Sequence, residues 1–207
     1  MAAPDAAALA GRYDGGQMEI AAELELKSDG RFQYALSYGA LDEEASGRWE
    51  VRGGQVLLTS DPVTAPRFVL LDAKPLAERR LRVALDLPQG GDPQYFSALV
   101  GLADGRRIER QLGPEGLDMA LPAGARAVSV ALRLDVYGLQ GEPAALPAGA
   151  GADVRFRFDV NDLGKVAFDH QPLRIDDEGR LVLARHGRTI VFRAERGDRE
   201  SGDTHSR

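Results

Sequence analysis

The stretch Ile20-Ala21-Ala22-Glu23-Leu24-Glu25-Leu26 decides the fold, because apolar and polar side chains alternate along it. Alternation with a period of two is typical of a β-strand with one buried face. Ser28-Asp29-Gly30 follows and favours a tight turn, since glycine tolerates positive φ and aspartate caps its own backbone. The alternation then resumes over Arg31–Tyr38. The sequence therefore predicts a β-hairpin.

Short strands of the same kind are expected at both ends of the chain. In the first part they are Ile20–Leu26, Arg31–Tyr38, Gly47–Val51, Gln55–Thr59 and Arg67–Leu71, and in the last part Leu173–Ile175, Leu181–Leu183 and Thr189–Phe192. Together they make eight strands, the number that closes a small barrel around side chains or one small ligand. The fold class predicted is all-β, with an eight-stranded antiparallel barrel.

The segment between these two sets of strands has a different sequence pattern. Its alternating runs, such as Leu81–Leu87, are separated by turns rich in glycine and proline. It is predicted to be a small β-sandwich that interrupts the barrel, because insertions are tolerated where chain ends lie close together. The expected organisation is a flexible N-terminus (1–10), a discontinuous barrel (11–75 and 166–194), an inserted sandwich (78–164) and a disordered tail (195–207).

Composition excludes several classes of function. The chain has 207 residues, with 26 Lys and Arg against 32 Asp and Glu and a net charge of −6. No nucleic-acid partner is expected, because such a partner requires a basic face. No run approaches the roughly 20 apolar residues that span a bilayer, so no transmembrane segment is expected. The absence of cysteine excludes disulfides, thiolate catalysis and Cys-ligated zinc.

The first residues suggest a compartment. Met1–Ala8 is too short and too polar for a signal peptide, but it is similar to the small-residue segment that often follows a cleavage site. We therefore expect a periplasmic or secreted protein whose signal peptide has been removed. The alternative is the N-terminus of a cytoplasmic protein.

Several motifs together resemble a family. They are Gly11-Arg12-Tyr13, Leu24–Phe32 with its Asp29-Gly30 turn, Gly47-Arg48-Trp49, Gly53–Leu58 and the C-terminal Leu173–Phe192. This pattern is similar to the lipocalin-like barrel of envelope proteins, and most of all to the N-terminal barrel of the NlpE-like copper-resistance lipoproteins. The middle segment carries Asp104-Gly105, Gly116–Leu121 followed by Pro122-Ala123-Gly124, and Val128-Ser129-Val130. This pattern weakly resembles a prealbumin-like or carboxypeptidase-regulatory-like sandwich. The copper-resistance family carries an anchoring Cys and a CxxC motif that this chain lacks, so copper binding does not transfer.

The aromatic residues of the first strands are the candidate binding site. Tyr34, Tyr38 and Trp49 would line a small apolar pocket, with tyrosine hydroxyls orienting the ligand. The alternative is that these residues, together with Phe32, form the core of the barrel.

The histidine and acidic residues are weaker candidates for a functional site than the aromatic residues. His170, His186 and His205 are expected on the surface, because nothing in their spacing brings them together with carboxylates as a metal site or a catalytic triad requires. Asp42, Glu43 and Glu44 are expected in a solvated loop, the alternative being a cation site with Asp14. No catalytic residue, metal ligand or cofactor is assigned.

The function expected is that of a non-catalytic envelope protein that binds a small apolar ligand inside the barrel. A first alternative is a periplasmic protein-interaction or structural module with a filled barrel. A second alternative is a hydrolytic enzyme without a recognisable motif, which requires titratable groups such as His170 with Asp169 or Glu43 to converge in a cleft.

Overall fold

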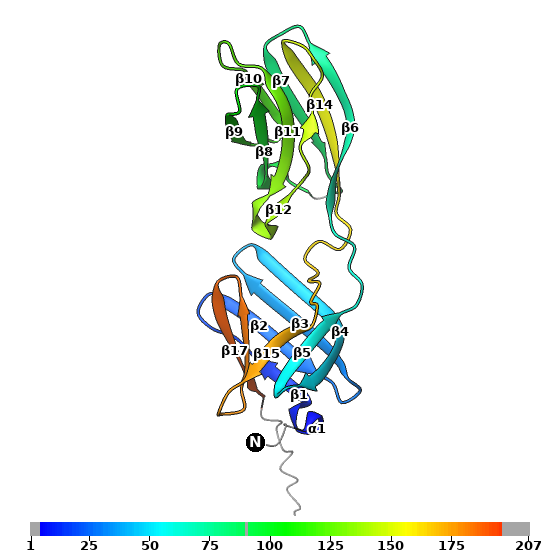
Figure 1. Ribbon diagram of the computed structural model, residues 1–207, viewed down its shortest axis with the longest axis vertical. Coiled ribbons are helices and arrows are strands. Elements are labelled where there is room, and N and C mark those ends of the chain that lie inside the picture. The colour runs from blue at the N-terminus through cyan, green and yellow to red at the C-terminus, as the bar shows by residue number, and fades with distance from the viewer. Residues whose placement is uncertain (1–4, 90, 196–207) are drawn as a thin grey trace, which may run out of the picture. The chain divides into compact units, whose positions relative to one another are not determined.

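The computed structural model describes residues 5–89 and 91–195, which fold into two units (Figure 1). The first unit is discontinuous and contains residues Met1–Val63 and Gly164–Arg207, and the second contains Thr64–Leu163. Residues 1–4, most of the predicted tail and His205 lie outside the described residues. The chain is all-β, as predicted.

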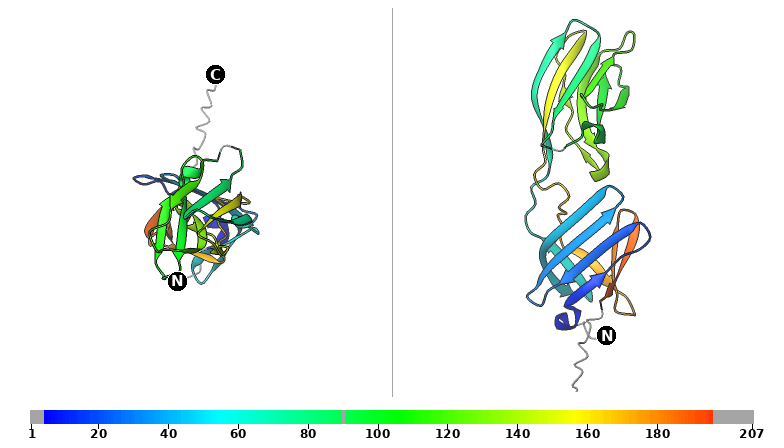
Figure 2. Two further views of the ribbon diagram at one scale, coloured as in Figure 1. Left: turned by 90° about the horizontal axis from the view of Figure 1, so that it is seen from above. Right: turned by 180° about the vertical axis from the view of Figure 1, so that it is seen from behind.

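The first unit is a closed barrel of eight antiparallel strands in the order β1-β17-β16-β15-β5-β4-β3-β2. The strands are β1 (Gly11–Asp14), β2 (Ile20–Leu26), β3 (Arg31–Tyr38), β4 (Leu41–Arg52), β5 (Gln55–Ser60), β15 (Gln171–Ile175), β16 (Leu181–Arg185) and β17 (Arg188–Ala194). Figure 2 shows the long strands β2, β3 and β4 side by side in one wall of the barrel. The predicted eight-stranded barrel is thus confirmed.

The hairpin of β2 and β3 has the register that its alternation requires. Ile20 pairs with Tyr38 and Leu26 with Phe32, so the apolar residues of both strands face the same side of the sheet. That side is the barrel interior, where Leu24, Leu26 and Phe32 are 1 % exposed. The turn contains Gly30 with φ of +80°, a conformation that favours glycine.

Helices are few and short in the described part of the chain. Ala6–Leu9 forms α1, a single turn capped by Asp5, in a region that the sequence predicts to be flexible. Its Leu9 is buried, and the Leu9 carbonyl accepts a hydrogen bond of 2.6 Å from the Tyr13 hydroxyl. The two 3-10 turns, η1 (Pro93–Tyr95) and η2 (Asp135–Tyr137), lie in the second unit. None of these helices has the length and apolar character needed to cross a membrane.

The second unit consists of two sheets that share one core. The first sheet has the order β10-β7-β14-β6 and the second β12-β11-β8-β9, with β13 pairing β11. Their strands are β6 (Arg67–Leu76), β7 (Arg80–Asp86), β8 (Phe96–Leu102), β9 (Arg107–Gln111), β10 (Leu117–Ala120), β11 (Ala127–Leu134), β12 (Leu139–Gln140), β13 (Ala144–Ala145) and β14 (Gly151–Asp159). Apolar residues of β7, β8, β11 and β14 interdigitate in this core.

The boundary between the units differs from the expected one. The sequence places Arg67–Leu71 in the barrel, but this segment belongs to β6, which pairs with β14 of the second unit from Arg67 to Leu76. The eighth place in the barrel belongs instead to β1, a strand of only four residues. Alternation identifies a strand but does not identify its partner, and four residues are too few to show a periodicity.

We predict that Gly47→Ala destabilises the barrel. A Cβ at Gly47 would run into the Thr59 carbonyl oxygen and Ser60 Cα, backbone atoms of the paired strand that cannot move aside. The expected loss is about 1–3 kcal/mol in the free energy of unfolding, measured by denaturant titration. Gly11→Ala is the control, because a Cβ there meets no atom within 4 Å. Equal midpoints for the two variants would contradict the prediction.

Candidate functional site

The three aromatic residues of the predicted ligand site are spread along the barrel. In the strand register, Tyr38 lies opposite Leu41 at one end of β4, and Tyr34 lies opposite Ala45. Trp49 is four residues further along β4, where its indole Nε1 donates a hydrogen bond of 2.9 Å to the Lys27 carbonyl. Tyr34 and Trp49 are buried, and Tyr38 is half-buried.

The barrel interior around Tyr34 is filled by phenylalanine rings. The ring of Phe168 lies 5.3 Å from that of Tyr34 in an edge-on arrangement, and the ring of Phe192 lies 6.5 Å from it. Phe32 packs on the other side of Phe168, with ring centroids 6.3 Å apart. Phe168 is 4 % exposed although it comes from the connection before β15 rather than from a barrel strand.

A polar cluster lies next to Tyr34. Glu43 of β4 and Arg185 of β16 form a two-pronged ion pair, with distances of 2.6 and 2.7 Å. The guanidinium also lies over the Phe168 ring, 5.3 Å from its centroid. His186 Nε2 is 3.0 Å from Glu43 Oε1. The Glu43 side chain is only 8 % exposed, so this ion pair is largely shielded from water.

The burial of this cluster shifts its pKa values. Burial by itself would raise the pKa of Glu43, but hydrogen bonds and positive charge from Arg185 and His186 outweigh it, and the pKa is lowered. The Tyr34 hydroxyl is buried next to Arg185 and Glu43 but forms no hydrogen bond of good geometry. Burial and the nearby Glu43 charge raise the pKa of Tyr34, so this hydroxyl stays protonated at any physiological pH.

The structure brings together one histidine–carboxylate pair that the sequence did not identify. His186 has a positive φ of +51° in the turn between β16 and β17, and from there it reaches Glu43. The other contact, His170 Nδ1 to Asp169 at 2.7 Å, joins chain neighbours on an exposed loop. Within residues 5–89 and 91–195, no three His, Asp or Glu residues are grouped as a metal ion requires.

The residues Asp42, Glu43 and Glu44 belong to strand β4, not to the predicted acidic loop. Their side chains therefore alternate, with Glu43 on the side of the core residues Leu41 and Ala45 and its two neighbours on the outer face. The period of two that runs through Leu41, Glu43 and Ala45 is visible in the sequence, but the run of charges obscures it.

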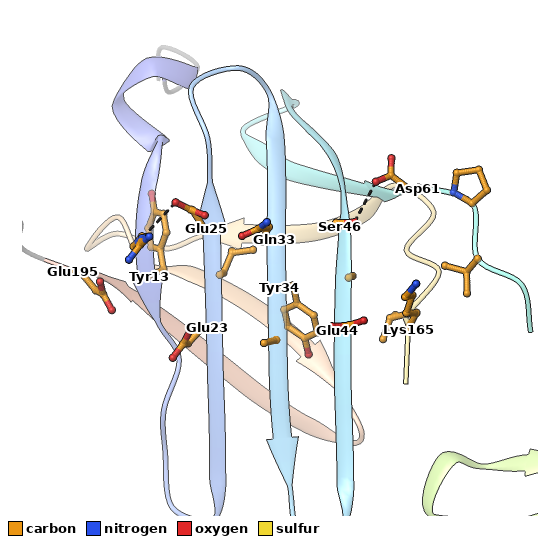
Figure 3. A pocket seen from close by; sticks show the side chains of 17 residues that line it. Tyr13, Glu23, Glu25, Gln33, Tyr34, Glu44, Ser46, Asp61, Lys165 and Glu195 are labelled. Atoms are coloured by element: carbon orange, nitrogen blue, oxygen red, sulfur yellow. Dashed lines mark hydrogen bonds and ion pairs between the residues drawn. The ribbon is translucent and has the colours of Figure 1, made fainter. Parts of the chain in front are cut away.

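A groove of about 720 Å³ lies across β1–β4 (Figure 3). Both exposed residues and the buried Tyr13, Leu24, Tyr34 and Ala45 border it. Side chains on its floor are Glu23, Glu25, Gln33, Ala35, Glu44 and Ser46. Arg12 and Glu195 border one side, and Asp61–Val63 with Lys165 border the other. A smaller cavity of about 360 Å³ lies over the outer faces of β5 and β15–β17.

Part of the charge in the groove is balanced. Glu25 forms ion pairs with Arg12 at 3.3 Å and with Lys27 at 3.7 Å. Asp61 is bonded by both terminal nitrogens of Arg31 and by the Ser46 hydroxyl. The groove is therefore a polar surface of the size of a ligand pocket, and its remaining acids are open to a partner.

We predict that Glu43→Gln lowers the free energy of unfolding by about 2–3 kcal/mol, because it leaves the Arg185 charge half-buried without its counter-ion. Glu50→Gln is the matched control in the same strand. Glu50 pairs with Arg52 on the surface, where the expected loss is below about 1 kcal/mol. Urea denaturation at neutral pH measures both, and similar losses would refute a special role for the buried pair.

The lowered pKa of Glu43 also predicts a pH dependence. A carboxyl whose folded pKa lies below its unfolded value of about 4.3 stabilises the fold above that pH, and this stabilisation is lost as pH falls through the folded pKa. The stability gap between the wild type and Glu43→Gln should therefore narrow between about pH 5 and about pH 3. Denaturant titrations at each pH measure the gap, and a constant gap would contradict the prediction.

The eight-stranded antiparallel barrel is consistent with a lipocalin-like barrel. Neither the surface groove nor the buried ion pair was expected from the sequence. The ion pair joins β4 to β16, which are far apart in the chain, and the groove needs β4 to extend through the acidic run that was predicted to be a loop. No family model, curated protein or solved structure matches the chain.

Proposed function

We propose that this protein is a non-catalytic binding protein of the bacterial envelope that acts through the outer surface of a filled barrel, with another protein as its partner. The observation that supports this proposal most is the packed interior. Four aromatic side chains, each at most 4 % exposed, fill the space that a ligand inside the barrel would occupy: Phe32, Tyr34, Phe168 and Phe192.

The polar groups near the interior also favour a structural role. Both oxygens of Glu43 are engaged by Arg185, and one of them also by His186. A carboxylate held in this way serves to close the barrel end and is poorly placed to act as a base towards a substrate. Assignment to the envelope rests on the resemblance of the Gly11-Arg12-Tyr13 and Gly47-Arg48-Trp49 motifs to NlpE-like lipoproteins.

The outer groove supports a partner rather than a ligand in the barrel. Its volume of about 720 Å³ falls in the usual range of binding pockets, and charged and amide side chains line it together with apolar ones such as Pro62, Val63 and Val166. A protein segment is the kind of partner that fits such an open polar surface, because protein interfaces combine hydrogen bonds with polar margins.

The test compares the wild type with Phe168→Ala in binding 1-anilinonaphthalene-8-sulfonate and benzene. The wild type should show no saturable dye fluorescence and no rise in melting temperature with either compound, because its interior is occupied. Removal of the Phe168 ring should create an apolar cavity that accepts benzene, which makes this variant the positive control. Saturable one-to-one dye binding by the wild type, with thermal stabilisation, would overturn the filled-barrel proposal.

A further inference from the structure

Strand β6 lies at the end of its sheet. In the part of the chain that the structure describes, it pairs with a strand on one side only, and Figure 1 shows it at the outer edge beside β14. The backbone N–H and C=O groups along its other side have no strand partner, and such an edge can pair with another chain. The closed barrel offers no edge of this kind.

The two halves of β6 differ in the features that prevent edge pairing. Lys74 and Pro75 lie in the C-terminal half, where a charged side chain and a missing N–H protect the edge. The N-terminal half, Arg67–Leu71, contains neither lysine nor proline. Its Leu70 and Leu71 side chains are 42 % and 45 % exposed. By contrast, the strands at the other sheet ends, β9, β10 and β12, have only two to five residues.

The register with β14 shows which face each residue of β6 belongs to, because cross-strand partners project to the same side. Two residues face the core, since their partners in β14 are buried phenylalanines: Phe68 and Leu70. Three residues lie on the outer face, since their partners in β14 are charged: Arg67, Val69 and Asp72. Leu71 is the extra residue of a β-bulge, which is why Asp72 shares the face of Val69.

Two copies of this half-strand match each other when they run antiparallel with Val69 opposite Val69. A two-fold axis perpendicular to the sheet then keeps core-facing residues opposite core-facing residues. Phe68 lies opposite Leu70 of the second copy, so an apolar side chain covers the exposed leucine. Arg67 lies opposite Asp72 at both ends, which brings opposite charges together twice.

The present contacts of these charges leave room for the new ones. Arg67 contacts Asp159 through its Nε at 3.0 Å, and its side chain is 69 % exposed. Asp72 pairs with Lys74 of the same strand, and its side chain is 48 % exposed. Both groups can therefore reach across the edge.

Other symmetric registers match less well. With the bulge on the axis, Arg67 would face Lys74 of the second copy. With Asp72 on the axis, two like charges would meet, which destabilises a sheet. With Ala73 on the axis, Pro75 would enter the pairing without an N–H to donate. The charges and the proline thus favour the register centred on Val69.

We propose that this protein forms a two-fold symmetric dimer in which the N-terminal halves of two β6 strands pair with Val69 on the axis. The two four-stranded sheets then form one continuous sheet. About six residues of each copy take part, fewer than the roughly 20–30 per side of a standard interface, so we expect a dissociation constant of roughly 10 µM to 1 mM. The inference concerns the second unit and does not depend on the proposed function of the barrel.

Introduced cysteines test the register, because the chain has no cysteine of its own. Val69→Cys places two thiols on the axis, where antiparallel Cα atoms lie roughly 4.5–5.5 Å apart, within reach of a disulfide. Lys74→Cys is the control on the same face of the same strand, with its two thiols about 25 Å apart in the dimer. Under mild oxidation, Val69→Cys alone should give a covalent dimer on non-reducing electrophoresis. Equal cross-linking of both variants, or none of Val69→Cys, would overturn the inference.

Sedimentation equilibrium of the full chain without cysteine tests the association itself. The wild type should show a monomer–dimer equilibrium at millimolar concentration. Arg67→Glu places two acids opposite each other and should weaken association at least about tenfold, whereas Arg67→Glu/Asp72→Lys restores opposite charges and should recover it. A wild type that stays monomeric, a single variant that still associates or a double variant that does not recover would each contradict the proposed pairing.

Discussion

The barrel depends on the hydrogen bonds that join Ser60 and Phe168. The Ser60 amide donates to the Phe168 carbonyl, and the Phe168 amide donates to the Ser60 hydroxyl, which in turn donates to the Val166 carbonyl. These bonds hold together the point where the chain leaves the barrel and the point where it returns. They also fix the backbone of Phe168, whose ring is buried in the core of the barrel.

The alternation of the first strands was enough to predict the hairpin, the all-β class and the eight-stranded barrel. It was not enough to assign β6 and β1, because strand pairing between Arg67–Leu76 and Gly151–Asp159 depends on residues that are distant in sequence. The prediction that Asp42-Glu43-Glu44 lies in a solvated loop was wrong for a related reason. A charged residue on the inner face is rare unless it is paired, and its partner Arg185 lies far along the chain.

The candidate site was predictable only in part. The sequence identifies Tyr34, Tyr38 and Trp49 as aromatic residues of one face, and the strand register places them at different levels of the barrel. The interior beside Tyr34 is filled by the ring of Phe168. Phe168 lies outside the barrel strands, so no alternation predicts that it is buried.

The discontinuity of the barrel has a consequence for its synthesis. Strands β1–β5 leave the ribosome first, but β5 must wait for β15 and β1 for β17 until Thr64–Leu163 has been made. At ordinary rates of translation those residues take about 5–20 s, during which two strand edges of the unfinished barrel stay unpaired. Such edges are templates for aggregation, so the barrel is exposed to misassociation until β15 and β17 are available to pair with β5 and β1.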